Sequence, residues 1–242
     1  MTILIKKKAF FTAYGMFLSA LAAVFFGLII VSGAGCNDDT NSVNNVSKDI
    51  ASINNVSVGF YSENATRDNT LILTEAKFVV RQLMLKNING SDHNVNLGPF
   101  VVNLDLRQDV IVVGIARIPA GDYDKIKFQI HKPNPNENIP DPDFTEGNNR
   151  RFSVVTKGSY NNVPFVFKSD VTTATSIDIE NRPVTIDQLV NITVRLDVYS
   201  WFMDNGALID PSDENNRNII KQNIKNSLRR AFRDANLDGE PD

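Results

Sequence analysis

Short runs of alternating apolar and polar residues follow one another through most of the chain after residue 53. They are rich in valine, isoleucine, threonine and aromatic residues, and they cover 76–86, 110–118, 123–130, 152–155, 163–168, 175–180 and 190–202. Alternating side chains point to opposite faces of a β-strand, and many short strands separated by turns are typical of a sandwich or barrel. We therefore expect an all-β domain over 53–206, with an immunoglobulin-like or prealbumin-like β-sandwich fold.

The stretch 207–233 has a different period. Four apolar residues recur there at every fourth position: Ile220, Ile224, Leu228 and Phe232. This spacing places them on one side of a helix, and Asp210 followed by Pro211 is typical of a helix start. The pattern predicts a C-terminal amphipathic helix of about six turns whose apolar side packs on the sandwich.

Residues 132–149 interrupt the strand pattern. Four prolines lie among acidic residues and asparagines: Pro133, Pro135, Pro140 and Pro142. Proline has no backbone N–H to donate to a sheet, so we expect a long exposed loop. Two interpretations stay open for it, a binding loop carried by the sheets and a solvated connection without a partner.

The N-terminus has the pattern of an export signal. Lys6, Lys7 and Lys8 precede an apolar run over 9–31, and small residues then lead to the only cysteine, Cys36. Small residues before a cysteine resemble a bacterial lipobox, which predicts a signal peptide over 1–35 and lipidation of Cys36. Two or more acyl chains would then hold the protein at a membrane. The alternative is an uncleaved signal anchor, because a run of this length also spans a bilayer as a helix.

Residues 36–52 are rich in asparagine, serine and aspartate and predict a flexible tether between the membrane and the domain. Asp38 and Asp39 lie close behind the cysteine, where acidic residues resemble the surface-export signal of Bacteroidota lipoproteins. We therefore expect a lipoprotein of the bacterial cell envelope, in the outer membrane and facing the periplasm or the cell surface.

Composition narrows the classes of protein further. The chain of 242 residues is 42% hydrophobic, which excludes a mainly disordered chain and a multi-span membrane protein. Its net charge of −3 argues against a nucleic-acid partner. Removal of 1–35 leaves 22 basic and 28 acidic residues, so lipid rather than charge must hold the protein at the membrane.

The last nine residues, 234–242, contain the beginning of a calcium-binding pattern. Oxygen-bearing side chains occur at the first, third and fifth positions, a glycine at the sixth and an acid at the ninth, as in an EF-hand loop. The candidate ligands of Ca²⁺ are Asp234, Asn236, Asp238, Glu240 and Asp242. The alternative is a charged, frayed tail in which asparagine and glycine end the preceding helix.

The sequence offers little for catalysis. It has no Gly-x-Ser-x-Gly motif, and its two histidines, His93 and His131, are expected to be surface side chains. Tyr199 and Trp201, at the end of the last predicted strand, are expected to pack in the core rather than line a ligand site. We therefore predict a non-enzymatic binding or structural protein whose loops take a glycan or a protein, the alternative being an accessory protein that binds calcium or another metal.

The stretch 118–126 reads Ile-Pro-Ala-Gly-Asp-Tyr-Asp-Lys-Ile, a tight turn followed by an alternating strand. Together with the strand 76–86 and the segments 98–100 and 104–106 before it, this order resembles bacterial lipoproteins that carry domain of unknown function 4382. A weaker similarity connects it to the copper-binding family that partners methanobactin systems. Both resemblances imply a secreted β-sandwich, and neither supplies catalytic residues.

Overall fold

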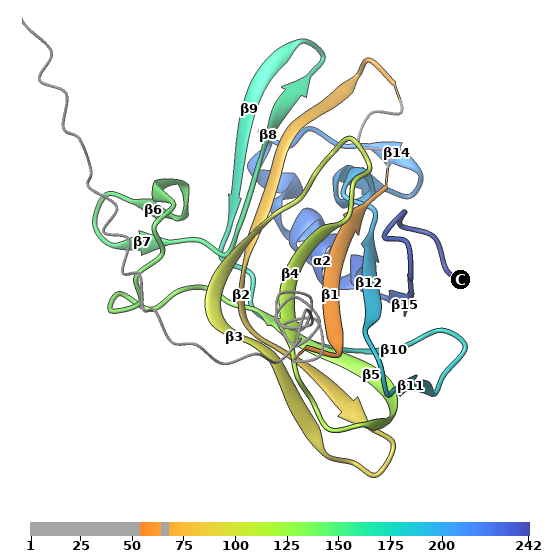
Figure 1. The fold of residues 1–242 in the computed structure, drawn as a ribbon. Coiled ribbons are helices and arrows are strands. Elements are labelled where there is room, and N and C mark those ends of the chain that lie inside the picture. Colours follow the sequence, from red (N-terminus) through yellow and green to blue (C-terminus); the bar gives the residue numbers. More distant parts are fainter. Residues whose placement is uncertain (1–53, 64–67) are drawn as a thin grey trace, which may run out of the picture. The chain divides into compact units, whose positions relative to one another are not determined.

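Two large β-sheets and two small two-stranded sheets, β6-β7 and β13-β14, make up the domain in the computed structural model, which describes residues 54–63 and 68–242 (Figure 1). The strands are β1 (Val56–Ser62), β2 (Leu71–Asn87), β3 (Asp92–Asn103), β4 (Ile111–Ala116), β5 (Gly121–Ile130), β6 (Thr145–Glu146), β7 (Arg150–Arg151), β8 (Val154–Tyr160), β9 (Val163–Ser169), β10 (Thr173–Asp178), β11 (Val184–Ile186), β12 (Val190–Leu196), β13 (Met203–Asp204), β14 (Ala207–Leu208) and β15 (Arg230–Arg233). The helices are α2 (Arg217–Ser227) and three 3-10 helices, η1 (Pro142–Phe144), η2 (Tyr199–Phe202) and η3 (Glu214–Asn216). The all-β prediction is confirmed.

The smaller of the two main sheets has the order β15-β12-β1-β4, and the larger has the order β10-β5-β2-β8-β9. In addition, β3 pairs with β2 and β11 pairs with β5. Phe60 of β1 packs edge to face against Phe78 of β2 and Phe128 of β5, at centroid distances of 5.4 and 5.3 Å. These three buried rings join the inner faces of the two sheets, as expected for alternating strands that each bury one face.

The long strand β2 changes its neighbour near its middle. Residues 71–78 pair with β8, and residues 80–87 pair with β5 on the same edge, while β3 occupies the other edge. At the junction, the N–H of Val79 donates to the carbonyl of Ser153 and its carbonyl accepts from the N–H of His131. The segment between β5 and β8 therefore leaves the sheet at this point. The connection from β9 to β10 lies beside it, because the N–H of Lys132 donates to Thr172 Oγ1.

The proline-rich segment 132–149 contributes no strand to the large sheet, as predicted, but it is not wholly exposed. It contains η1 and β6, and β6 pairs with β7. Phe144 and Ile139 are buried in a small apolar cluster with Val79, Phe152 and Val155. The expectation of a fully exposed loop is therefore wrong, because the segment buries its own apolar side chains against the outer face of the sheet.

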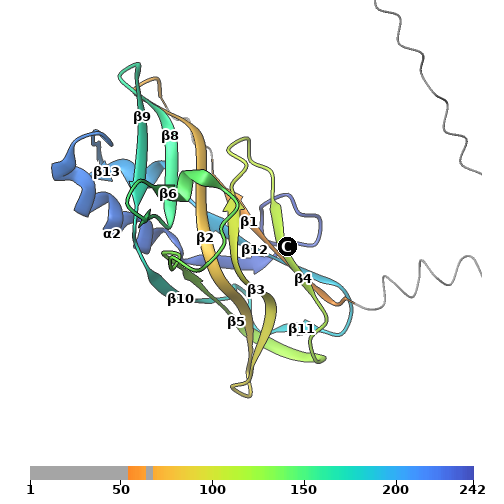
Figure 2. The same ribbon diagram turned by 90° about the vertical axis from the view of Figure 1, so that its left-hand side faces the viewer.

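The predicted long helix over 207–233 is wrong in its extent. The α-helix covers only Arg217–Ser227, and η3 before it is capped by Asp213 rather than by Asp210. After Leu228 the chain forms β15, which pairs with β12 and belongs to the small sheet, so the sandwich continues past residue 206. Figure 2 shows α2 beside β9.

The apolar stripe itself is buried as expected, although on two kinds of element. Ile220 and Ile224 face the core from α2, whereas Phe232 is buried on β15 outside the main core cluster, on the strand face opposite to Ala231. The indole Nε1 of Trp201 donates to Ser227 Oγ over 2.8 Å at the end of the helix. Trp201 lies in η2 rather than at the end of a strand, and its burial confirms the predicted core role.

Candidate functional site

The C-terminal residues predicted to bind calcium form a closed loop, and the buried carboxylate of its first residue, Asp234, holds the loop together. Asp234 is fully buried, and its carboxylate accepts hydrogen bonds from the N–H groups of Asp238 at 3.1 Å and Gly239 at 3.0 Å. Gly239 has a φ of +82°, and a Cβ there would lie 2.3 Å from the ring of Tyr61. The loop therefore turns sharply at a glycine and packs against β1.

The other candidate ligands are directed to different partners. Asn236 donates to Asp238 over 2.8 Å, and Glu240 pairs with Arg195 at 2.9 Å. Asp242 accepts a backbone N–H at 3.0 Å. Within residues 54–63 and 68–242, no group of three or more histidine, cysteine, aspartate or glutamate side chains is placed to hold a metal ion. The structure thus brings the tail residues into one loop without joining their oxygens around a common point.

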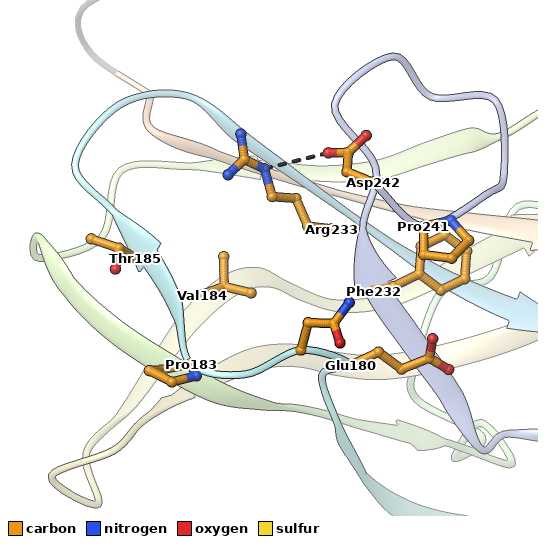
Figure 3. A pocket seen from close by; sticks show the side chains of 9 residues that line it. Glu180, Pro183, Val184, Thr185, Phe232, Arg233, Pro241 and Asp242 are labelled. Carbon is orange, nitrogen blue, oxygen red and sulfur yellow. Dashed lines mark ion pairs between the residues drawn. The ribbon is translucent and has the colours of Figure 1, made fainter.

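A pocket of about 330 Å³ opens beside this loop (Figure 3). It is lined by Glu180, Asn181, Pro183, Val184, Thr185, Phe232, Arg233, Pro241 and Asp242. Three segments build it: the turn after β10 with the beginning of β11, the strand β15 and residues 241–242. We call it the edge pocket. No local motif in the sequence predicts it, because its walls are far apart along the chain.

Charged and apolar groups alternate around the edge pocket. In Figure 3, the Arg233–Asp242 ion pair, with a separation of 3.4 Å, lies on one side and Glu180 on the other. Hydrogen bonds from the Arg230 guanidinium, 2.7 and 3.1 Å long, hold the pKa of Glu180 below its ordinary value and keep it ionised. The site therefore offers fixed hydrogen-bond donors and acceptors beside the apolar surface of Pro241.

A second charged cluster lies around Lys77, whose side chain is only 8% exposed. Its Nζ lies 2.7 Å from Glu75, 2.6 Å from Asp141 and 2.6 Å from Asp143. Burial lowers the pKa of Lys77, but the hydrogen bonds to these carboxylates outweigh that effect and raise the pKa above its ordinary value. Lys157 and Lys77 together lower the pKa of Asp143 to about 2. The cluster ties η1 to the strands β2 and β8.

One of the two histidines departs from the surface position expected for it. His131 is 6% exposed, and its Nε2 lies 2.7 Å from Glu137 in the proline-rich segment. His93 is half-buried on β3, with its ring 5.7 Å from that of Tyr123. The contact between His131 and Glu137 holds the beginning of the proline-rich segment against the end of β5.

Cys36, the predicted signal peptide 1–35 and the predicted tether 36–52 lie outside the residues that the structure describes. In the described part of the chain, no helix has the length and apolar character needed to cross a bilayer. Comparisons with family models, with curated proteins and with solved structures found no match for this chain.

Proposed function

We propose that this protein is a lipid-anchored, non-enzymatic binding protein of the bacterial cell envelope. The anchor is supported by the order of Lys6–Lys8, the apolar run 9–31 and the small residues before Cys36. The resemblance of 118–126 to lipoproteins with domain of unknown function 4382 supports the same assignment. The domain then extends from the membrane on the tether 36–52 and presents its pocket to the envelope.

The edge pocket is the observation that supports binding, and a glycan is the class of ligand that fits it. Its volume of about 330 Å³ lies at the lower end of the range for small-molecule sites. Sugar hydroxyls both donate and accept hydrogen bonds, which suits neighbouring guanidinium and carboxylate groups such as Arg233 and Asp242. The ring of Pro241 supplies an apolar wall for the C–H face of a sugar.

Arg233→Ala is expected to weaken glycan binding by about tenfold, since it removes hydrogen bonds from a charged donor in the pocket. The measurement is a glycan array probed with the detergent-solubilised full chain, followed by titration calorimetry with the glycan that binds. Arg107→Ala is the matched control, because Arg107 is 85% exposed and does not line the pocket. Equal affinities of the wild type and Arg233→Ala would refute the assignment of the pocket.

The anchor has its own test. Metabolic labelling with a fatty acid should mark the wild type and leave Cys36→Ser unlabelled, because serine has no thiol to be acylated. Fractionation alone does not decide, since the variant keeps the apolar run 9–31, which is long enough to span a bilayer. A wild type that takes up no fatty acid would instead favour the uncleaved signal anchor.

A further inference from the structure

A second pocket lies where the large sheet divides, and its walls are basic. It is lined by Lys132, Arg150, Arg151, Phe152, Lys168, Asp170, Arg217 and Lys221. Lys132 follows β5, Arg150 and Arg151 form β7, Lys168 and Asp170 lie at the end of β9, and Arg217 and Lys221 belong to α2. The change of partner along β2 brings the ends of these segments together. We call this site the basic pocket.

Positive charge in the basic pocket exceeds negative charge. Six basic side chains line it together with the single carboxylate of Asp170, which pairs with Lys221 at 2.7 Å and with Lys132 at 3.7 Å. Just outside the wall, Glu214 pairs with Arg217 and Glu146 pairs with Arg150. The six cations therefore outnumber these three carboxylates, in a chain whose net charge is −3, and Arg151 and Lys168 have no carboxylate partner in the described part of the chain.

Two of the cations have donor groups that the protein leaves unused. The Nε of Arg151 is buried without a hydrogen-bond partner in the described structure, although another nitrogen of the same guanidinium donates to the carbonyl of Pro135 over 3.1 Å. Lys168 forms no ion pair with a described carboxylate, and its ammonium lies 5.2 Å from the ring centroid of Phe152. A buried charged donor without a partner is costly, so an external acceptor would stabilise this arrangement.

The size of the basic pocket limits the ligand. The cavity has a volume of about 100 Å³, against about 330 Å³ for the edge pocket. This smaller volume suits a small oxyanion better than a sugar ring or a nucleobase. Among small oxyanions, phosphate carries nearly two negative charges at neutral pH and three acceptor oxygens, and arginine is well suited to bind it.

We propose that the basic pocket binds a phosphate group, either as free phosphate or as a phosphate monoester on a larger molecule such as a lipid. Both sources present the same terminal oxygens to Arg151 and Lys168. The two flanks of the proline-rich segment, at Lys132 and Arg150, then form part of a binding site. This proposal is independent of the edge pocket, because the two sites share no lining residue.

Titration calorimetry with inorganic phosphate on the detergent-solubilised full chain tests the site. We expect saturable binding with a dissociation constant of about 1 mM or lower. Arg151→Met and Lys168→Met should each weaken binding by about tenfold, because each removes a charge-assisted hydrogen bond. Lys225→Met is the matched control, since it removes the same charge from α2 outside the pocket and should change the affinity by less than about twofold.

Three outcomes would overturn the proposal. They are no binding by the wild type at about 10 mM phosphate, unchanged affinity in both Arg151→Met and Lys168→Met, and an equal loss in the Lys225→Met control. Thermal unfolding of each variant checks its folding. If Arg151→Met unfolds, Lys168→Met decides, because its ammonium lies at the end of a strand without an ion pair in the described structure.

A binding experiment with lipid distinguishes free phosphate from a lipid phosphate monoester as the ligand. The protein is titrated with micelles of a nonionic detergent that contain phosphatidic acid, and micelles with phosphatidylcholine, which has no phosphate monoester, are the control. Competition between phosphatidic acid and inorganic phosphate would support a lipid monoester as the ligand. Binding of inorganic phosphate alone would support the free ion. Failure of both would refute the phosphate site and leave the glycan and anchor tests of the proposed function unaffected.

Discussion

Replacing Lys77 with methionine is expected to lower the free energy of unfolding by about 3 kcal/mol at neutral pH, as measured by chemical denaturation. Methionine keeps much of the apolar stem but removes the ammonium of a side chain that is only 8% exposed. Glu75, Asp141 and Asp143 would then repel one another with only Lys157 to compensate. Such a loss is typical when one partner of a buried ion pair is removed.

Lys157→Met provides the matched control for this experiment. Lys157 contacts Asp143 at 2.5 Å and Glu75 at 3.3 Å, but its side chain is 32% exposed. Water therefore replaces part of the lost interaction, and we expect a loss of about 1 kcal/mol. If the two variants lost equal amounts of stability, burial of Lys77 would not be the cause of its contribution.

The same cluster predicts how stability depends on pH. The pKa of Asp143 is lowered from 3.8 to about 2, first by its hydrogen bond with Lys157 and then by the one with Lys77. A carboxyl group with a lowered folded pKa stabilises the protein above its unfolded pKa and loses that contribution as pH falls. Stability of the wild type should therefore decline between about pH 4 and pH 2, and Lys77→Met should decline less steeply there.

The strand pattern was predictable because each strand buries one of its faces, which leaves an alternation in the sequence. The end of α2 was not, since Leu228 and Phe232 continue the period of four and yet both lie beyond the helix, Phe232 on the strand β15. A spacing of four residues places side chains on one side of a helix and also on one face of a strand. Residues 230–233 form a strand and not a further helical turn, because their backbone groups pair with the edge of β12 that β1 leaves open.

The two pockets were not predictable for a different reason. The basic pocket depends on the change of neighbour at Val79, and pairing between distant strands leaves no local pattern in the sequence. Lys132, Lys168 and Arg217 are far apart along the chain and meet only in the fold. The cluster around Lys77, which belongs to neither pocket, did leave a signal in the sequence, because Lys77 interrupts an otherwise apolar part of the run 76–86. A charge at such a position indicates a buried ion pair.

Asp234→Ala is expected to lower the free energy of unfolding by about 3 kcal/mol, even in the presence of EDTA. The fully buried carboxylate accepts the N–H groups of Asp238 and Gly239, and alanine would leave both donors without their acceptor. Hydrogen bonds to a charged group are worth about 1.5–3 kcal/mol each, and solvent reaching the loosened loop recovers part of the loss. Denaturation of the variant and of the wild type measures the difference.

Asp238→Ala and added calcium separate this structural role from the calcium prediction. Asp238 is exposed, so its replacement should cost less than about 1 kcal/mol without metal. An ion bound only by the folded state raises stability by mass action, so a calcium site would appear as stabilisation of the wild type that Asp238→Ala abolishes. We expect no such rise at about 1 mM calcium, because the side chains of Asn236, Glu240 and Asp242 are directed to different partners and not to one common point.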